Sequence, residues 1–252
     1  MKKQIKKWTL RLTVSGLLIT ILLLLIILKP VLTYAGKTTH SNYSVFHHQS
    51  LDPTLLSHLD NATEHLKTSE FYNPNLQLDI CLNDGSSYPD LMKTLRGAAF
   101  AWGFYNKVIL QGTTNVPENI VELHGYKWNL TQLLTHEMTH CLQFDYLGLR
   151  KSNPIAGIPD WKWEGYAEYI SRQNPNQKNL SKNIDRLIAS DETLWEVKFE
   201  DGTISPREYY NYWTLVQYSM DIKKMSYLQI LDDTTSEQLV RNQMMDWYYQ
   251  RN

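Results

Sequence analysis

Hydrophobic and polar residues follow different spacings along the chain, and each spacing predicts a different element. Residues 12–28 form a predominantly apolar run of 17 residues, about the length of a short membrane-spanning helix. Residues 76–82 alternate between apolar and polar, as in a half-buried strand, and end at the turn residues 83–85. A second strand is expected over residues 107–111. Helical spacing predicts helices over residues 51–67, 91–97, 205–225 and 236–249.

The clearest helix lies between Trp128 and Gly148. Asn129 can cap its first free amides, and Gln132 follows three residues later, as in a capping box. Apolar side chains then recur at Leu130, Leu133, Leu134, Met138, Cys141 and Leu142. We therefore expect an amphipathic helix that ends near Gly148.

The order of these elements predicts the fold class. We expect an α+β protein in which a small mixed sheet packs on the helix at residues 129–148 and a mainly helical C-terminal part follows. The polar residues 37–50 are expected to form an irregular lead-in, and residues 172–182 an exposed loop. The strand at residues 107–111 is a candidate for the sheet edge to which an extended peptide adds; an ordinary core strand is the alternative.

The N-terminus combines its apolar run with six basic residues and no acidic residue within residues 1–29. The run is short for a spanning helix and slightly long for a signal-peptide core. Because basic residues before such a run stay in the cytoplasm, either interpretation exports the rest. We expect a single-pass protein of the cell membrane, with residues 1–11 cytoplasmic, residues 12–28 as a signal anchor and residues 29–50 as a linker. The alternative is secretion after cleavage near Ala35.

The charge of the chain bears on its possible binding partners, and its two cysteines bear on whether it forms a disulfide. The net charge of −1 conceals 19 basic against 26 acidic residues beyond residue 29, a net of −7. This leaves no basic patch for nucleic acid, so no nucleic-acid partner is expected. Hydrophobic residues make up 42% of the chain, ample for one buried core in residues 51–252. Cys81 and Cys141 can form a disulfide in an oxidising compartment or remain two buried thiols.

The segment His136-Glu137-Met138-Thr139-His140 carries the strongest chemical signal. Its two histidines lie one helical turn apart, so both imidazoles occupy one face of the helix and can grip one Zn²⁺. Glu137 lies about 100° round the helix from His136, so it does not coordinate alongside that ring but can reach a water on the metal. Glu137 is therefore the natural general base. A short motif also occurs by chance, so its context decides.

Catalytic zinc needs a third protein ligand and an open coordination position. The stretch PDWKWEGYAEY at residues 159–169 offers Glu164 and Glu168. Twenty-three residues separate His140 from Glu164, enough for one helix to end, a loop to turn and a second helix to return. The two carboxylates are four residues apart and share one helix face, so one can bind metal while the other supports a ligand.

Together, HEMTH and IPDWKWEGYAEY resemble the gluzincin metallopeptidases, the HExxH-plus-Glu branch that includes thermolysin and the zinc aminopeptidases. They look most like the small bacterial peptidase-MA-like domains, and the likeness covers about 45 residues. It implies a zincin-like fold for residues 51–252, with Glu137 as the catalytic base. The zinc ligands that it implies are His136, His140 and Glu164. It also implies that Glu168 accepts the other ring N–H of a ligating histidine, for which His136 is the better candidate.

The resemblance implies a membrane-anchored zinc metallopeptidase that hydrolyses peptide or protein substrates by Glu-assisted attack of zinc-bound water. The Gly-x-Met-Glu-Asn signature of zinc aminopeptidases is absent, so an endopeptidase is expected. A donor for the developing oxyanion is sought among Tyr209, Tyr210 and Tyr212, and related domains have a tyrosine where Tyr209 stands. Core packing is the alternative role for these tyrosines, and His124 is another candidate donor.

A competing hypothesis is a non-catalytic, zinc-binding extracytoplasmic module with a structural or sensing role. Glu137 argues against it, because a purely structural site gains nothing from a base beside an open position. An intramembrane protease is excluded, since HEMTH lies more than 100 residues beyond the apolar run. The oligomeric state stays open.

Overall fold

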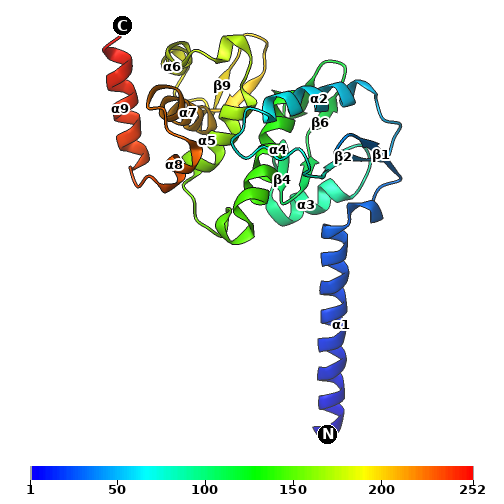
Figure 1. Ribbon diagram of the computed structural model, residues 1–252. Coiled ribbons are helices and arrows are strands. Elements are labelled where there is room, and N and C mark those ends of the chain that lie inside the picture. Colours follow the sequence, from blue (N-terminus) through cyan, green and yellow to red (C-terminus); the bar gives the residue numbers. More distant parts are fainter. Residues whose placement is uncertain (1, 252) are drawn as a thin grey trace.

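The computed structural model describes residues 2–251, with side chains from residue 7 onward (Figure 1). The side chains of Lys2, Lys3 and Lys6, which belong to the predicted cytoplasmic segment, lie outside the described residues. Helix α1 (Lys2–Leu28) projects away from the rest of the chain. Its segment Lys7–Leu28 has a mean hydropathy of 2.5, and it is long and apolar enough to cross a membrane or to serve as a signal sequence.

The predicted α+β class is confirmed. A small mixed sheet packs on a central helix, α4 (Leu130–Leu147), and a mainly helical part follows it. The main sheet has the strand order β1-β2-β3-β5-β4. Its strands, in chain order, are β1 (Gly36–His40), β2 (Tyr43–His47), β3 (Leu78–Cys81), β4 (Ala101–Phe104) and β5 (Lys107–Leu110). The strands β2, β3 and β5 are parallel, whereas β1 and β4 run antiparallel at the two edges.

Two expectations about this sheet are corrected. Residues 37–50 are not an irregular lead-in, because β1 and β2 form a hairpin over residues 36–47. The main sheet therefore begins at Gly36, inside the segment 29–50 that was expected to be a linker. The strand at residues 107–111, observed as β5, is not the sheet edge, because β4 covers its outer side.

The parallel strands bury their two faces in separate clusters. One face packs against α4 and α2 (Thr54–Leu66), and the other against α3 (Tyr88–Arg96). Alternation along the strands produces this division: Ile80 and Val108 face the first cluster, whereas Ile109 faces the second. Cys81 and Cys141 lie in opposite clusters as free, buried thiols, so the unpaired alternative holds.

Helix α4 begins and ends where the sequence predicts. The side chain of Asn129 accepts a hydrogen bond from the backbone N–H of Gln132, and Gly148 follows the helix with a φ of 75°. The helix is not amphipathic, however, because every residue from Leu130 to Phe144 is buried. Its buried threonines are satisfied internally, since Thr135 and Thr139 donate to carbonyls one turn earlier. The sheet, α2 and α5 (Asp160–Ser171) thus enclose α4.

Two smaller sheets were not predicted. One is antiparallel and contains β6 (Thr113–Asn115), β7 (Ile120–Leu123) and β8 (Tyr126–Asn129), the last of which runs directly into α4. The other is a hairpin of β9 (Glu196–Lys198) and β10 (Ile204–Pro206). Strands of three or four residues are too short for a visible alternation of hydrophobic side chains.

The C-terminal part is built around the contact of α5 (Asp160–Ser171) with α7 (Arg207–Gln217). Gly165 allows this contact, since a Cβ atom there would lie 2.6 Å from the carbonyl oxygen of Tyr212. The remaining elements are η1 (Pro30–Leu32), η2 (Leu149–Lys151), η3 (Pro175–Gln177), α6 (Leu180–Ala189), the π-helical η4 (Tyr218–Ile222), α8 (Tyr227–Asp232) and α9 (Glu237–Tyr249). Residues 172–182 are not simply an exposed loop, because η3 and the start of α6 lie there.

Candidate metal centre

Three predicted metal ligands converge on one point. His136 and His140 lie one turn apart on α4, and Glu164 reaches them from α5. Nε2 of His136 lies 3.2 Å from Nε2 of His140, and each of these nitrogens lies 3.2 Å from Oε2 of Glu164. The three side chains can hold one metal ion.

The charges at this point also favour a cation. Burial alone would lower the pKa of His136, but Glu164 and Glu168 raise it to about 10. Burial would raise the pKa of Glu164, yet His140 and His136 hold it well below its ordinary range. The carboxylate of Glu164 thus attracts positive charge between itself and the imidazoles. A divalent cation in place of the imidazole protons would meet the same attraction.

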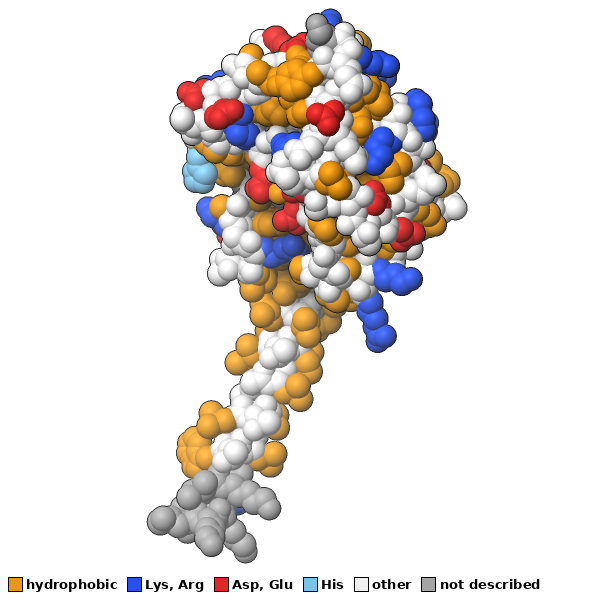
Figure 2. Space-filling view, turned by 90° about the vertical axis from the view of Figure 1, so that its left-hand side faces the viewer, with side chains coloured by type: hydrophobic (Ala, Val, Ile, Leu, Met, Phe, Trp, Pro, Cys, Tyr) orange, Lys and Arg blue, Asp and Glu red, His pale blue; other side chains and the backbone are white. Residues whose placement is uncertain are grey.

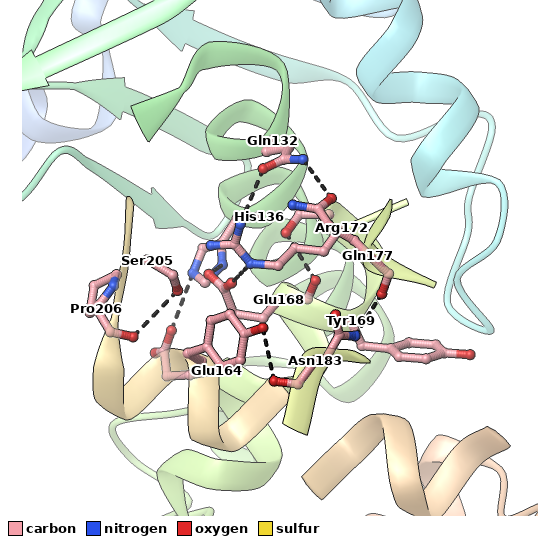
Figure 3. A network of polar contacts seen from close by, with 12 residues as sticks. Gln132, His136, Glu164, Glu168, Tyr169, Arg172, Gln177, Asn183, Ser205 and Pro206 are labelled. Carbon is pink, nitrogen blue, oxygen red and sulfur yellow. Dashed lines mark hydrogen bonds and ion pairs between the residues drawn. The ribbon is translucent and has the colours of Figure 1, made fainter. Parts of the chain in front are cut away.

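Glu168 lies at the other nitrogen of the His136 ring (Figure 3). Its Oε1 is 3.0 Å from Nδ1 of His136, in ion-pair contact without the direction of a regular hydrogen bond. The Glu168 side chain is fully buried, and burial would raise its pKa. Arg172 and His136 outweigh burial and lower the pKa of Glu168, so that it carries negative charge here. A carboxylate in this position can orient a ligating imidazole.

Arg172 balances the charge of Glu168. Its Nε donates to Oε2 of Glu168, and its guanidinium also donates to Oε1 of Gln132 at 3.2 Å (Figure 3). The guanidinium lies over three aromatic rings, 4.8 Å from Phe199, 5.5 Å from Trp213 and 5.8 Å from Trp128. Sequence reasoning placed Arg172 in an exposed loop, but it is only 2% exposed. The available signal was its spacing of four residues from Glu168, at the end of the same helix.

His140 has a different partner, Gln143, which sequence reasoning missed. Nδ1 of His140 lies 2.8 Å from Oε1 of Gln143, an acceptor that assigns the ring hydrogen to Nδ1 and leaves Nε2 free for a metal. Nε2 of Gln143 in turn donates to the hydroxyl of Tyr227 at 2.7 Å and to the carbonyl of Trp163 at 3.2 Å. Gln143 is fully buried, and this network holds its amide in one orientation.

Glu137 faces the same cleft from the adjacent position on α4. It is only 7% exposed, and burial raises its pKa above the usual range, although His136 and His140 act in the opposite direction. A raised pKa brings a carboxylate closer to the pKa that suits a general base at neutral pH. Glu137 is not among the three ligand side chains that meet at one point.

Tyr209 is the predicted tyrosine that reaches the centre. It lies on the first turn of α7, and its ring stacks on His136 with 5.8 Å between ring centres and 7° between planes. Burial, followed by Glu164 and Glu137, raises the pKa of Tyr209, so its hydroxyl stays protonated. Tyr210 and Tyr212 point elsewhere, because their hydroxyls contact Arg186 and Glu208 respectively.

The other candidate donor, His124, does not line the cleft. It is exposed in the turn between β7 and β8, with a φ of 54°. The position belongs to the hairpin turn, where a left-handed residue is followed by Gly125. His124 therefore has no part in the geometry of the centre.

The cleft has a volume of about 470 Å³ and runs between the three candidate metal ligands and the edge strand β4. Residues 98–103 form one wall, and Tyr209 and Trp163 lie on the helical side. Trp163 stacks on the His140 ring with 5.4 Å between centres. Further lining is largely apolar: Phe100, Leu123, Trp128, Leu133, Phe144 and Trp195. The centre thus opens into a cleft large enough to admit a segment of peptide.

Comparison with known proteins adds no relative. No protein-family model matches the sequence, and no curated protein matches it significantly. The interpretation of the centre therefore depends on its residues and their geometry.

Proposed function

We propose that this protein is a membrane-anchored zinc metallopeptidase of the gluzincin type. The observation that carries the proposal is the convergence of His136, His140 and Glu164 beside Glu137 in one open cleft. The spacing of these residues along the chain independently predicts the same four roles. A purely structural metal site would not need the buried carboxylate of Glu137 beside its ligands.

The donor set and its spacing suit zinc. Two imidazole nitrogens and one carboxylate oxygen are the ligands of many catalytic zinc sites. Tetrahedral zinc with bonds of about 2.0–2.1 Å separates neighbouring ligand atoms by about 3.3 Å. The three separations in this centre are each 3.2 Å. An ion could therefore fit among these three side chains with little movement.

The residues divide the work of hydrolysis. Zinc bound at the centre would supply Lewis-acid chemistry, lowering the pKa of water and polarising a carbonyl. Glu137 takes the proton from the attacking water and later delivers it to the leaving amine. The hydroxyl of Tyr209 donates a hydrogen bond to the carbonyl oxygen as negative charge develops there. Glu168 and Gln143 hold the two imidazoles in orientation.

The substrate is a peptide that lies along β4. This strand is the edge of the main sheet that lines the cleft, so its outer backbone groups can pair with an extended peptide. The sheet edge was expected at residues 107–111 but is formed by β4 (residues 101–104), of which residues 101–103 line the cleft. Backbone pairing would hold the scissile bond beside Glu137 without requiring a particular side chain.

The anchor is α1, the one helix among the described residues that is long and apolar enough to cross a membrane. We infer that it spans the cell membrane once and leaves the α+β domain on the exported side, in keeping with the basic residues that precede it. The chain between α1 and β1 supports retention rather than cleavage near Ala35. Tyr34 donates to the carbonyl of Leu82 at 2.8 Å, and Ser86 donates to the carbonyl of Thr33 at 2.9 Å. These contacts hold the segment in a structured turn.

The test combines metal analysis with peptide hydrolysis by the purified full-length protein. We expect about one zinc per chain and hydrolysis that a chelator abolishes and added zinc restores. Glu137→Gln should lower kcat by about 10²–10⁴-fold or more while zinc stays bound. His140→Ala should lose the zinc itself. The matched controls are the exposed Glu118→Gln and His124→Ala, which should leave both quantities unchanged.

Two outcomes would decide against the proposal. Hydrolysis that persists in Glu137→Gln would refute the assignment of the base. Stoichiometric zinc without hydrolysis of any peptide in a mixed library would favour the non-catalytic zinc-binding module instead.

A further inference from the structure

The last turn of α1 is docked on the α+β domain. The hydroxyl of Tyr88, on α3, donates to the carbonyl of Ile27 at 2.7 Å. Ile26 and Tyr34 pack against the buried cluster on the α3 face of the main sheet. The Tyr34 ring lies 5.9 Å from the ring of Phe46. The end of the apolar helix is therefore in direct contact with the α3 side of the domain, at the junction where α1 meets it (Figure 1).

A groove of about 490 Å³ lies at this joint, between the end of α1 and the strands β1, β3 and β5. Three lysines from separate parts of the chain line it: Lys29, Lys37 and Lys107. The one acidic residue in its lining is Asp79, which pairs with Lys107 at 3.3 Å. Lys29 and Lys37 are exposed and carry the excess positive charge of the groove, in a domain whose net charge is negative.

The rim of the same groove is apolar and exposed. Leu28 and Val31 are each 52% exposed, and Tyr105 is 58% exposed. They continue the exposed apolar surface of α1, which Figure 2 shows along the helix up to its junction with the domain. Apolar side chains in that position gain free energy when hydrocarbon covers them. The groove thus joins a positively charged pocket to an apolar wall at the end of a helix that can span a membrane.

We propose that this groove binds the headgroup of an anionic phospholipid. The phosphate lies between Lys29 and Lys37, and the acyl chains follow Leu28 and Val31 down α1. Lysines beside a membrane surface attract anionic lipids, and a pocket that also contacts the acyl chains selects a lipid over a free anion. The proposal rests on the anchoring of α1 in the membrane, which belongs to the proposed function. It is independent of the metal centre, since no residue of the groove lines the catalytic cleft.

The occupant follows from the position of the groove. A soluble anion would contact only the lysines and would leave the apolar rim of Leu28, Val31 and Tyr105 exposed. A lipid would also cover this rim with its acyl chains. A bound lipid would also fix the domain against the membrane surface, because the groove is walled by both α1 and the sheet. The orientation of the cleft above the membrane would then depend on lipid composition.

The experiment titrates short-chain lipids into the full-length protein in a neutral detergent and follows binding by calorimetry. Dihexanoyl phosphatidylglycerol is the anionic probe, dihexanoyl phosphatidylcholine the zwitterionic one, and inorganic phosphate the free anion. We expect saturable binding of phosphatidylglycerol alone. Each of Lys29→Gln and Lys37→Gln should weaken it about fivefold, and the double variant about 25-fold. Lys127→Gln with Lys182→Gln, both exposed and outside the groove, is the matched control and should bind normally.

Three results would overturn the proposal: equal binding of both lipids, equal binding of inorganic phosphate and phosphatidylglycerol, or unchanged binding in the Lys29/Lys37 double variant. Peptide hydrolysis in detergent is measured in parallel. Loss of lipid selectivity with hydrolysis intact would refute the groove alone, whereas absent hydrolysis with lipid binding intact would refute the peptidase alone.

Discussion

Gly103 on the edge strand β4 passes so close to Glu137 on α4 that a Cβ atom on Gly103 would lie 2.3 Å from the Glu137 carbonyl oxygen. The clashing atom belongs to the helix backbone, so no change of side-chain rotamer could relieve the clash. Only glycine therefore lets the strand approach the helix at this point. The close approach sets the distance between the proposed peptide-binding edge and the proposed base.

Gly103→Ala should push β4 away from α4. We expect a loss of stability of about 1–3 kcal/mol from overpacking, measured by urea unfolding. We also expect kcat/KM for peptide hydrolysis to fall about a hundredfold, since a shift of about 1 Å in a positioned substrate has that effect. Gly16→Ala is the control, because a Cβ there would meet no atom within 4 Å apart from the backbone of its own helix turns and its chain neighbours. Wild-type stability and activity in Gly103→Ala would contradict this account of the contact.

Gln143→Leu should weaken metal binding without removing a ligand. The substitution keeps the side chain's approximate size but leaves Nδ1 of His140 without its acceptor, so the ring is free to turn. We expect the affinity for Zn²⁺ to fall about 10–100-fold, measured by competition with a chromogenic chelator. Gln217→Leu is the matched control, since Gln217 is also buried and hydrogen-bonded but lies on α7 away from the ligands. Equal zinc affinity in both variants would show that Gln143 does not support metal binding by His140.

The local parts of this site could be predicted from sequence. Asn129 and Gly148 mark the ends of α4 through capping rules that depend on a few neighbouring residues. The geometry of His136 and His140 depends only on the helical repeat. Glu164 meets these histidines only because α5 packs back against α4. The 23 residues between His140 and Glu164 show only that the chain is long enough for this packing.

The remaining parts depend on contacts between distant segments. Strand β4 has four residues and contains Gly103, so it is too short to show an alternation of hydrophobic and polar residues in the sequence. Its position at the edge depends on the order of all the strands in the sheet. Gln143 and Arg172 are polar residues that sequence rules assign to a surface. They are buried because His140 and Glu168 need partners there, a requirement that appears only once α4 and α5 are packed together.

Tyr209→Phe should lower kcat by about 10–100-fold and change KM little, because the hydroxyl is proposed to act on developing charge rather than on the bound substrate. The phenyl ring keeps the stacking on His136, so folding and zinc content should stay unchanged. Tyr212→Phe is the control on the same helix, since the Tyr212 hydroxyl donates to Glu208 instead. An equal effect of the two substitutions on kcat would assign Tyr209 a packing role.

Removal of the metal should reverse how stability depends on pH. In the chelator-treated protein the pKa of His136 is about 10, against about 6.5 in an unfolded chain. Because the folded-state pKa is the higher one, the stabilisation by protonated His136 is complete below about pH 6.5 and is lost as the pH rises towards 10. Glu164 has a lowered pKa, so its contribution is present above about pH 4.3 and is lost as the pH falls further.

The chelator-treated protein should therefore lose stability steadily above about pH 6.5, as followed by its urea midpoint. With zinc bound the trend should be the opposite between about pH 5 and 7, because both imidazoles must lose their protons before they can bind the metal. His124→Ala should leave both profiles unchanged, since that histidine is exposed and lies outside the cleft. Parallel profiles with and without zinc would mean that His136 and His140 do not exchange their protons for a cation.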